Sequence, residues 1–219
     1  MTRGILVVGN ESPTTAAVAA SARARVETIV EAIAPTRIGS DRPIPAAGSL
    51  AWNPSSAVSA RTLVLGATTR LGRIDEALLV CSPPAIRRRV DELVPAEIDT
   101  LVDDLIKGWF LVAREVAVAF RARKGGTLAL VLSEGGLGGG KEDAPDLFGG
   151  TVAAGFRAFA QALLASSFKE SYRVLAFSTA EAGVDAEFGD FVFKVLDEGS
   201  KRDAGKWHKY GKSGLFGLM

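Results

Sequence analysis

Residues 97–133, EIDTLVDDLIKGWFLVAREVAVAFRARKGGTLALVLS, decide the fold of this chain. Their apolar side chains recur at three- and four-residue spacing, which predicts one long helix over 97–123. Gly125-Gly126 end that helix, and the apolar run 127–132 behind them is typical of a strand buried on both faces. A long helix that leads directly into a buried strand is the repeating unit of parallel α/β sheets.

The same alternation extends in both directions along the chain. Strands are expected at 5–8, 26–33, 50–52, 77–81, 173–177 and 214–219, and helices at 16–23, 54–71, 149–167 and 185–200. In the helix before Gly72, the buried side is expected to include Val58, Leu65 and Leu71. This order predicts an α/β fold, with a single doubly wound, Rossmann-like parallel sheet in three layers and right-handed crossovers.

Composition narrows the class of protein. The chain has 219 residues, 47% of them hydrophobic, which suits one well-packed domain over 1–219. A net charge of +1 gives no electrostatic reason to expect binding to nucleic acid or to an anionic membrane. With one cysteine and one histidine, neither an internal disulfide nor a metal site is expected. The apolar run at 5–8 is too short for a signal or a membrane span, so we expect a cytoplasmic protein.

The segment 134–146 is rich in glycine and is expected to be a flexible loop. Part of it, GGLGGGK at 135–141, fits the spacing of a phosphate-binding P-loop. However, Glu142 stands where a serine or threonine should bind magnesium, and Asp143 adds further negative charge. We therefore favour a loop or lid over a site for a nucleoside triphosphate.

Over most of the chain, the order and spacing of these elements resemble the short-chain dehydrogenase/reductase (SDR) family. In that family a helix carrying NxxG precedes a strand of the type GxIVNISS, and here LIKG at 105–108 precedes a strand that ends in Ser133. The resemblance implies NAD or NADP as the cofactor and hydride transfer assisted by a Ser-Tyr-Lys set with an Asn. It also implies homodimers or homotetramers formed through the helices at 97–123 and 149–167.

The resemblance assigns candidate site residues. Ser133 falls at the place of the catalytic serine. The positions that match cofactor contacts are Gly9, Asn10 and Ser12 in the first loop, Glu31 at the end of the second strand, Asn53 near the adenine and Cys81 after the fourth strand of the family.

Each candidate also has a purely structural interpretation. Ser12 can cap a helix that begins at Pro13, and Ser133 can cap a turn. Cys81 can be a small core residue. Glu31 and Asn53 are more simply explained as polar residues at the edges of loops.

The glycine loop and the helix asparagine of the family are not retained. The second and third loop glycines, which let the backbone approach a pyrophosphate, fall at Pro13 and Thr15. Pro13 also removes an amide donor. The asparagine falls at Leu105.

The catalytic tyrosine and lysine are missing as well. They fall at Gly149 and Ala153, and the two tyrosines of the chain, Tyr172 and Tyr210, lie elsewhere. His208 has a suitable pKa for proton transfer but stands in a polar segment, so we interpret it as a surface or interface histidine.

Three hypotheses follow from these departures. The first is a divergent SDR-like protein without standard dehydrogenase activity, which is a pseudoenzyme, scaffold or ligand-binding protein. The alternative is an NAD(P)-dependent oxidoreductase with rearranged catalytic residues around Ser133. A third is a binding module for a nucleotide-like metabolite, in a crevice at the carboxyl ends of the strands.

Small residues on the helix at 149–167 suggest a surface for close helix pairing. They are Gly150, Ala153, Ala154, Ala158, Ala162 and Ala165. On the long helix, Trp109, Phe110 and Phe120 are expected to supply apolar anchors. An isologous dimer or a tetramer is the expected assembly, although the same small residues can also pack onto the sheet.

Overall fold

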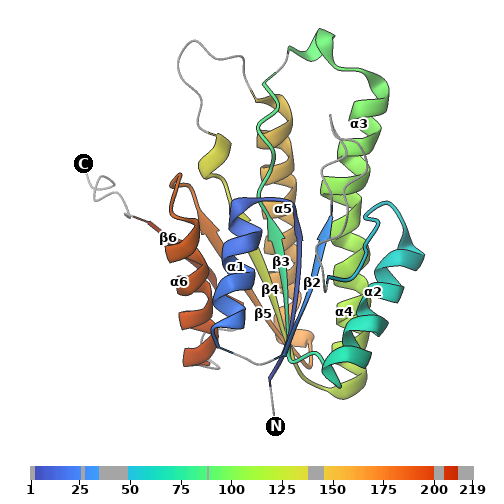
Figure 1. Ribbon diagram of the computed structural model, residues 1–219, viewed down its shortest axis with the longest axis vertical. Helices are drawn as coiled ribbons and strands as arrows, with labels where there is room; N and C mark the ends of the chain where they lie inside the picture. The colour runs from blue at the N-terminus through green and yellow to red at the C-terminus, as the bar shows by residue number, and fades with distance from the viewer. Residues whose placement is uncertain are drawn as a thin grey trace.

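The computed structural model describes residues 3–25, 28–34, 49–87, 89–137, 146–199 and 205–211. Its centre is a six-stranded sheet in the order β2-β1-β3-β4-β5-β6, in which every neighbouring pair is parallel (Figure 1). The strands are β1 Gly4–Asn10, β2 Thr28–Ala34, β3 Glu76–Cys81, β4 Thr127–Ser133, β5 Arg173–Thr179 and β6 Trp207–Tyr210. The predicted single, doubly wound parallel sheet is therefore confirmed.

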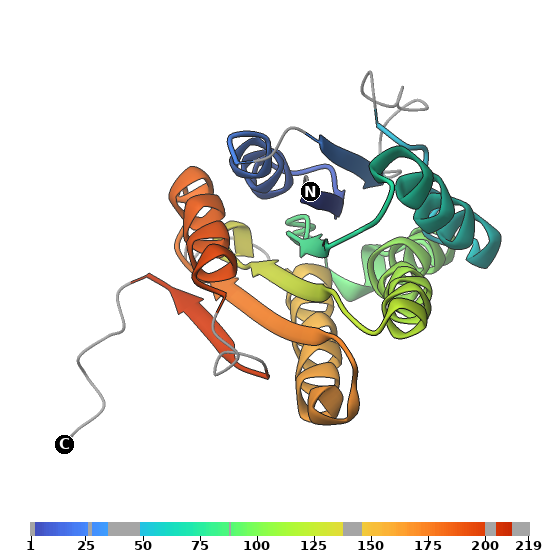
Figure 2. The same cartoon turned by 90° about the horizontal axis from the view of Figure 1, so that it is seen from below.

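Helices cover both faces of this sheet (Figure 2). On one face lie α1 Pro13–Arg23 and α6 Asp185–Glu198, and on the other lie α2 Ala57–Leu71, α3 Pro95–Val102, α4 Gly108–Arg123 and α5 Leu147–Ser166. Each layer has its own apolar core against the sheet, because side chains of a buried strand alternate between the two faces. The three predicted layers are thus present.

One strand prediction needs correction. Leu50–Trp52 is not a strand: the Leu50 amide donates to the Glu31 carbonyl at 2.7 Å, but no ladder follows. The strand expected at 214–219 lies outside the described residues. The sequence did not predict β6, because the segment WHKY is only four residues long.

The long helix is interrupted. A π-helical turn at Asp103–Lys107 separates α3 from α4, so one predicted helix becomes two joined segments. Beside that turn Gly108 packs against Pro54, since a Cβ on Gly108 would lie 2.6 Å from the Pro54 Cβ. The helix ends at Lys124, whose φ of 57° is left-handed.

Several side chains face differently from the prediction. Val58 and Leu65 are 76% and 58% exposed, and α2 instead buries Ala60, Leu63, Val64 and Ala67. Conversely Trp109 and Phe120 lie fully within the core and so are not surface anchors, which leaves Phe110 as the exposed aromatic of α4. The spacing of apolar residues along a helix does not by itself specify which of its sides packs against the sheet.

The small-residue helix α5 is half embedded. Of the predicted set, Ala153 packs toward the sheet, whereas Gly150, Ala154, Ala158, Ala162 and Ala165 are exposed. The stretch Leu147–Lys169 has the length and apolar composition of a membrane span, but within this fold one side of it packs in the core through Val152, Phe156 and Ala160. Before it, Gly135–Leu137 form a short 3-10 turn, and 138–145 of the predicted loop lie outside the described residues.

Candidate functional site

The carboxyl edge of the sheet is where this topology places a site. The chain leaves β1 toward α1 on one face and leaves β2 toward α2 on the other, so the strand order reverses at β1. In open α/β sheets, ligands bind at such a switch point. The strand ends that meet there carry Asn10, Cys81 and Ser133.

An amide clamp joins the ends of β1 and β3. The Asn10 Nδ2 donates to the Ser82 carbonyl at 2.6 Å, and the Ser82 amide donates to Asn10 Oδ1 at 3.0 Å. Asn10 is buried, and its side-chain amide bonds to the backbone just beyond the last paired residues of β1 and β3. Asn10 was predicted as a cofactor contact, but its amide is occupied by the chain itself.

The turn after β1 is filled by Thr15. A Cβ on Gly9 would lie 2.5 Å from both Oγ1 and Cγ2 of Thr15, so the two residues are in close contact. The Thr15 hydroxyl donates to the Asn10 carbonyl at 2.7 Å. Ser12 caps α1 as predicted, because its Oγ accepts the Thr15 amide at 3.1 Å.

The backbone amides of this turn are mostly engaged within the chain. Glu11 donates to the Ala34 carbonyl at 3.1 Å, and Ala16 donates to the Ser12 carbonyl at 3.1 Å. The Thr14 hydroxyl donates to Asp185 at 2.5 Å, which brings a carboxylate to the start of α1. With Pro13 lacking an amide, this turn does not fit a dinucleotide pyrophosphate in the manner of a glycine-rich cradle.

Cys81 is a core residue. Its side chain is fully buried at the end of β3, on the face covered by α2, α4 and α5. Burial raises the pKa of its thiol strongly, the charge of Glu134 adds to the shift, and the nearby Trp109 indole offsets only part of it. A buried thiol of this kind is a poor nucleophile.

Ser133 lies at the end of β4 and retains a free hydroxyl. It is 6% exposed, and its Oγ has no hydrogen-bond partner among the residues that the structure describes. Its place in the strand continues the series of Ala129 and Val131, which face α1 and α6. Ser133 and Cys81 therefore point to opposite faces of the sheet.

A row of hydroxyl side chains crosses the same edge. Ser133 pairs in register with Thr179 of β5, which pairs in turn with Tyr210 of β6. The Tyr210 ring packs against Phe188 and Phe191 of α6, with ring centroids at 5.9 and 5.4 Å. Tyr210 thus lies two strands from Ser133, a backbone separation of about 10 Å at ordinary strand spacing.

An ion pair beside Ser133 was not anticipated from the sequence. Glu134 follows β4 and pairs with Arg157 of α5. The Arg157 guanidinium also lies 5.8 Å from the Trp207 ring, and the Trp207 indole donates to Ser178 at 2.8 Å. In the sequence, the signals for these contacts of Arg157 are its place within an apolar helix and the aromatic side chain of Trp207.

Asp146 is a second residue that the sequence did not reveal. Its Oδ1 accepts the Gly149 amide at 2.7 Å and the Ile86 amide at 3.3 Å, so it caps α5 and holds the chain that follows β3. A Cβ at Gly149 would lie 2.3 Å from Asp146 Oδ2 and 2.4 Å from Leu137. A tyrosine therefore has no room at the aligned position.

The remaining candidates lie apart from this edge. Glu31 was placed at the end of the second strand, but it lies in the middle of β2 and pairs with Arg23 of α1. Asn53 Oδ1 accepts hydrogen bonds from Ser55, at 3.1 Å from the amide and 2.8 Å from the hydroxyl, in the turn before α2. Both residues have structural partners that explain them.

The other titratable candidates are also accounted for. Tyr172 stands just before β5, at the opposite edge of the sheet, where its ring lies 5.6 Å from that of Phe120. His208 is a half-buried residue of β6 that stacks on Phe177 at 5.3 Å. Within the described ranges, no three His, Cys, Asp or Glu side chains gather as metal ligands would.

Comparisons with known proteins give the fold. No protein-family model matches the sequence, and no curated protein matches it. Among solved structures, a short-chain dehydrogenase from Mycobacterium smegmatis superposes with a TM-score of 0.71 at 15% identity, covering 97% of this chain and 93% of that one.

Two further structures agree. A metagenomic short-chain oxidoreductase in complex with NADP has a TM-score of 0.71 at 17% identity, with 96% of this chain and 99% of that chain covered. A double mutant of a Serratia marcescens short-chain dehydrogenase/reductase has a TM-score of 0.68 at 13% identity, with 95% and 96% covered. This chain has the fold of the short-chain dehydrogenases/reductases.

Proposed function

We propose that this protein is a divergent SDR-fold protein without standard dehydrogenase activity, which acts as a ligand-binding protein or scaffold. The turn after β1 carries the proposal. Thr15 occupies the space over Gly9, Asn10 is clamped to Ser82, and the Glu11, Thr15 and Ala16 amides are engaged within the chain. We also propose that the protein works in the cytoplasm, as its composition and this fold suggest.

The surroundings of Ser133 support the same proposal. Carbonyl reduction needs a proton donor close to the substrate oxygen. Tyr210 lies two strands away with its ring on α6, and Tyr172 lies at the other edge of the sheet. The aligned tyrosine position, Gly149, has no space for a side chain.

Thermal denaturation with and without millimolar NAD(H) and NADP(H) tests this proposal. A ligand that binds only the folded state raises the Tm in proportion to the logarithm of its concentration over its Kd. We expect no shift with any of the four forms. A clear rise with one cofactor would overturn the proposal.

One observation favours the alternative of an NAD(P)-dependent oxidoreductase with rearranged catalytic residues. The Ser133 hydroxyl is free of partners among the described residues, and a solved structure of the same fold is an oxidoreductase in complex with NADP. This alternative predicts a nicotinamide-dependent turnover that Ser133→Ala abolishes. If Ser133→Ala leaves such a turnover intact, the alternative fails.

We further propose that the chain forms homo-oligomers through α4 and α5. Phe110 of α4 is exposed and lies 4.4 Å from the Phe159 ring of α5, and the exposed small residues of α5 lie on the outer side of that helix. Light scattering should give a dimer or tetramer. Ala158→Arg should reduce the mass to that of a monomer, while Ala186→Arg on α6 should not.

A further inference from the structure

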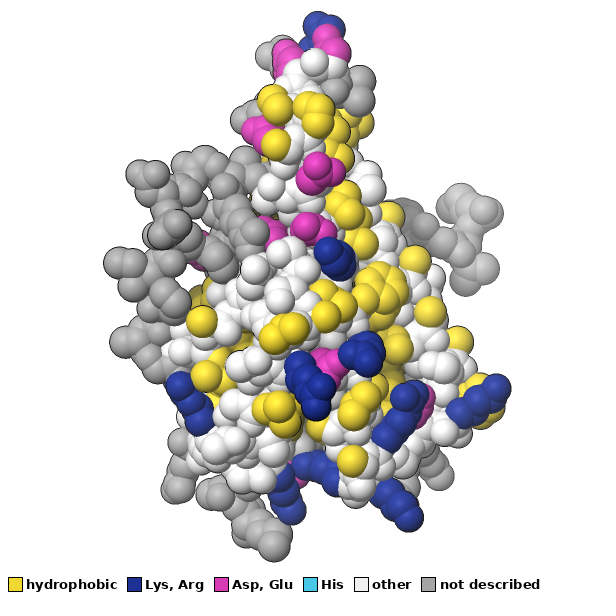
Figure 3. Space-filling view, turned by 90° about the vertical axis from the view of Figure 1, so that its right-hand side faces the viewer, with side chains coloured by type: hydrophobic (Ala, Val, Ile, Leu, Met, Phe, Trp, Pro, Cys, Tyr) yellow, Lys and Arg dark blue, Asp and Glu magenta, His cyan; other side chains and the backbone are white. Residues whose placement is uncertain are grey.

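A long groove lies between α2 and α4, away from the carboxyl edge. It encloses about 790 Å³, and apolar side chains line it: Val64, Ile74 and Phe120 lie deep, and Val58, Leu65 and Val118 border it. The exposed side of these helices shows hydrophobic and basic side chains together (Figure 3). The groove follows the fifteen residues of α2, about 22 Å of helix.

Apolar exposure along this groove is unusual for a free surface. Val58, Leu65 and Val118 are each more than half exposed, although they lie on neighbouring helices and face one groove. Contiguous apolar patches on soluble proteins commonly mark binding sites. The aliphatic side chains that follow one another along the groove suit a flexible apolar chain.

The charge of the groove is positive. Its lining includes Arg61, Arg73, Arg114 and Arg123, against the single carboxylate of Glu115. Glu115 pairs with Arg114, and Asp75, just outside, pairs with both Arg73 and Arg123. Four arginines against these two carboxylates leave a net charge of +2. Arg61 has no partner among the described residues.

We infer that this groove binds a single-chain anionic amphiphile, such as a fatty carboxylate. Its chain lies along the aliphatic lining, and its head group pairs with Arg61. A second copy of this protein would bring the same arginines face to face across a symmetric contact, which like charges oppose. The inference does not depend on the absence of dehydrogenase activity, because the groove shares no residue with the carboxyl edge. The groove is lined by other residues of α4 than Phe110, on which the proposed oligomer contact is argued.

Isothermal titration with dodecanoate, kept below its micelle concentration, tests this inference. Dodecyltrimethylammonium has the same chain with the opposite charge, and acetate has the same head without the chain. We expect one dodecanoate per chain and little binding of the other two. Equal affinity for the cationic amphiphile, or many weak sites for dodecanoate, would overturn the inference.

Matched variants locate the site. Arg61→Glu and Val118→Asp should each weaken dodecanoate binding about tenfold or more. The first replaces the positive charge beside the carboxylate by a negative one, and the second places a charged side chain against the alkyl chain of dodecanoate. Lys194→Glu and Ala186→Asp make the same changes on α6, on the other face of the sheet, and should leave the affinity unchanged. If all four variants bind like the wild type, the groove is not the site. Thermal unfolding of each variant checks that it is folded.

Discussion

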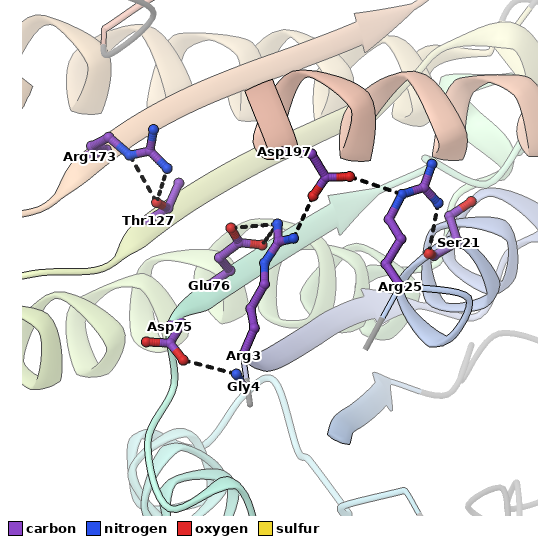
Figure 4. Close-up of polar contacts among 9 residues, drawn as sticks. All are labelled: Arg3, Gly4, Ser21, Arg25, Asp75, Glu76, Thr127, Arg173 and Asp197. Atoms are coloured by element: carbon purple, nitrogen blue, oxygen red, sulfur yellow. Dashed lines mark hydrogen bonds and ion pairs between the residues drawn. The ribbon is translucent and has the colours of Figure 1, made fainter. Parts of the chain in front are cut away.

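The two edges of the sheet are held together by different chemistry. At the amino edge, charged groups join strands and helices that are far apart in sequence: Arg3 of the chain before β1 contacts Glu76 of β3 and Asp197 of α6 (Figure 4). Asp197 also accepts from Arg25, which follows α1. At the carboxyl edge, the neutral clamp between Asn10 and Ser82 joins β1 to β3, beside the ion pair of Glu134 with Arg157.

The amino edge therefore contributes mainly to stability, whereas the carboxyl edge holds the groups that could contact a ligand. Charge pairs at the amino edge satisfy each other and leave little chemistry for a ligand. The carboxyl edge carries the free hydroxyl of Ser133 in a row with Thr179, and a single change there need not expose an unpaired charge. The amino edge is therefore where mutation should damage folding most.

The largest effect is expected at Arg3. Arg3→Met leaves the Glu76 carboxylate, which is 6% exposed, without the guanidinium that it contacts at 2.6 and 2.7 Å. Removing one partner of a buried pair costs about 3 kcal/mol in the free energy of unfolding. Denaturant unfolding measures this loss.

Two controls sharpen the result. Arg3→Met combined with Glu76→Met replaces both partners by apolar groups and should recover most of the loss. Arg89→Met breaks an exposed pair with Asp91 and should cost less than about 1 kcal/mol. If Arg3→Met and Arg89→Met cost the same, the amino edge is not a stabilising network.

A smaller loss is expected at the carboxyl edge. Asn10→Ala removes both hydrogen bonds to Ser82 and leaves two backbone groups unpaired, which costs about 2 kcal/mol. The exposed Asn53→Ala is the matched control, since its bonds to Ser55 lie at the surface. Equal losses for the two asparagines would show that the clamp contributes nothing special.

The order of strands and helices could be predicted from the sequence, because burial of one face produces a periodic pattern of apolar residues. The run at 127–132 and the helix before it could be recognised for this reason. The π turn at Asp103–Lys107 lies inside a continuous helical pattern and has no residue type of its own that would mark it. Strand β6 has too few apolar residues to show a period.

The site was only partly accessible. The cap by Ser12 follows from local turn chemistry, so the sequence predicts it. The bonds from Asn10 to Ser82 and from Glu134 to Arg157 join residues 72 and 23 positions apart. Contacts of that kind depend on strand register and helix rotation, which periodicity does not specify.

The filled turn can be tested by a double-mutant cycle. Gly9→Ala places a Cβ 2.5 Å from the Thr15 side chain and should cost about 2 kcal/mol by overpacking. In a Thr15→Ala background the same change should cost about 1 kcal/mol less, because Oγ1 and Cγ2 are gone. Additive effects in urea unfolding would mean that Thr15 does not fill this space.

The smallest effect is expected at Asp75, back at the amino edge, and it depends on pH. Burial acts to raise the pKa of this carboxyl, but the Gly4 amide, Arg73 and Arg123 outweigh it and hold the pKa below its usual value. The neighbouring Glu76 differs, since burial raises its pKa despite Arg3. The two carboxyls therefore act on pH-dependent stability with opposite sign.

Comparison of the wild type with Asp75→Asn isolates one of them. A depressed pKa in the folded state contributes stability above the unfolded pKa, about 3.9 for Asp, and that contribution is lost as the pH falls through the folded value. At pH 7 the variant should be less stable by about 0.5–1 kcal/mol, because its amide still accepts from Gly4 but lacks the charge. The difference should shrink as the pH falls below about 4. A difference that stays constant down to low pH would mean that the carboxylate charge contributes nothing, and that the amino edge is held by Arg3 and its partners alone.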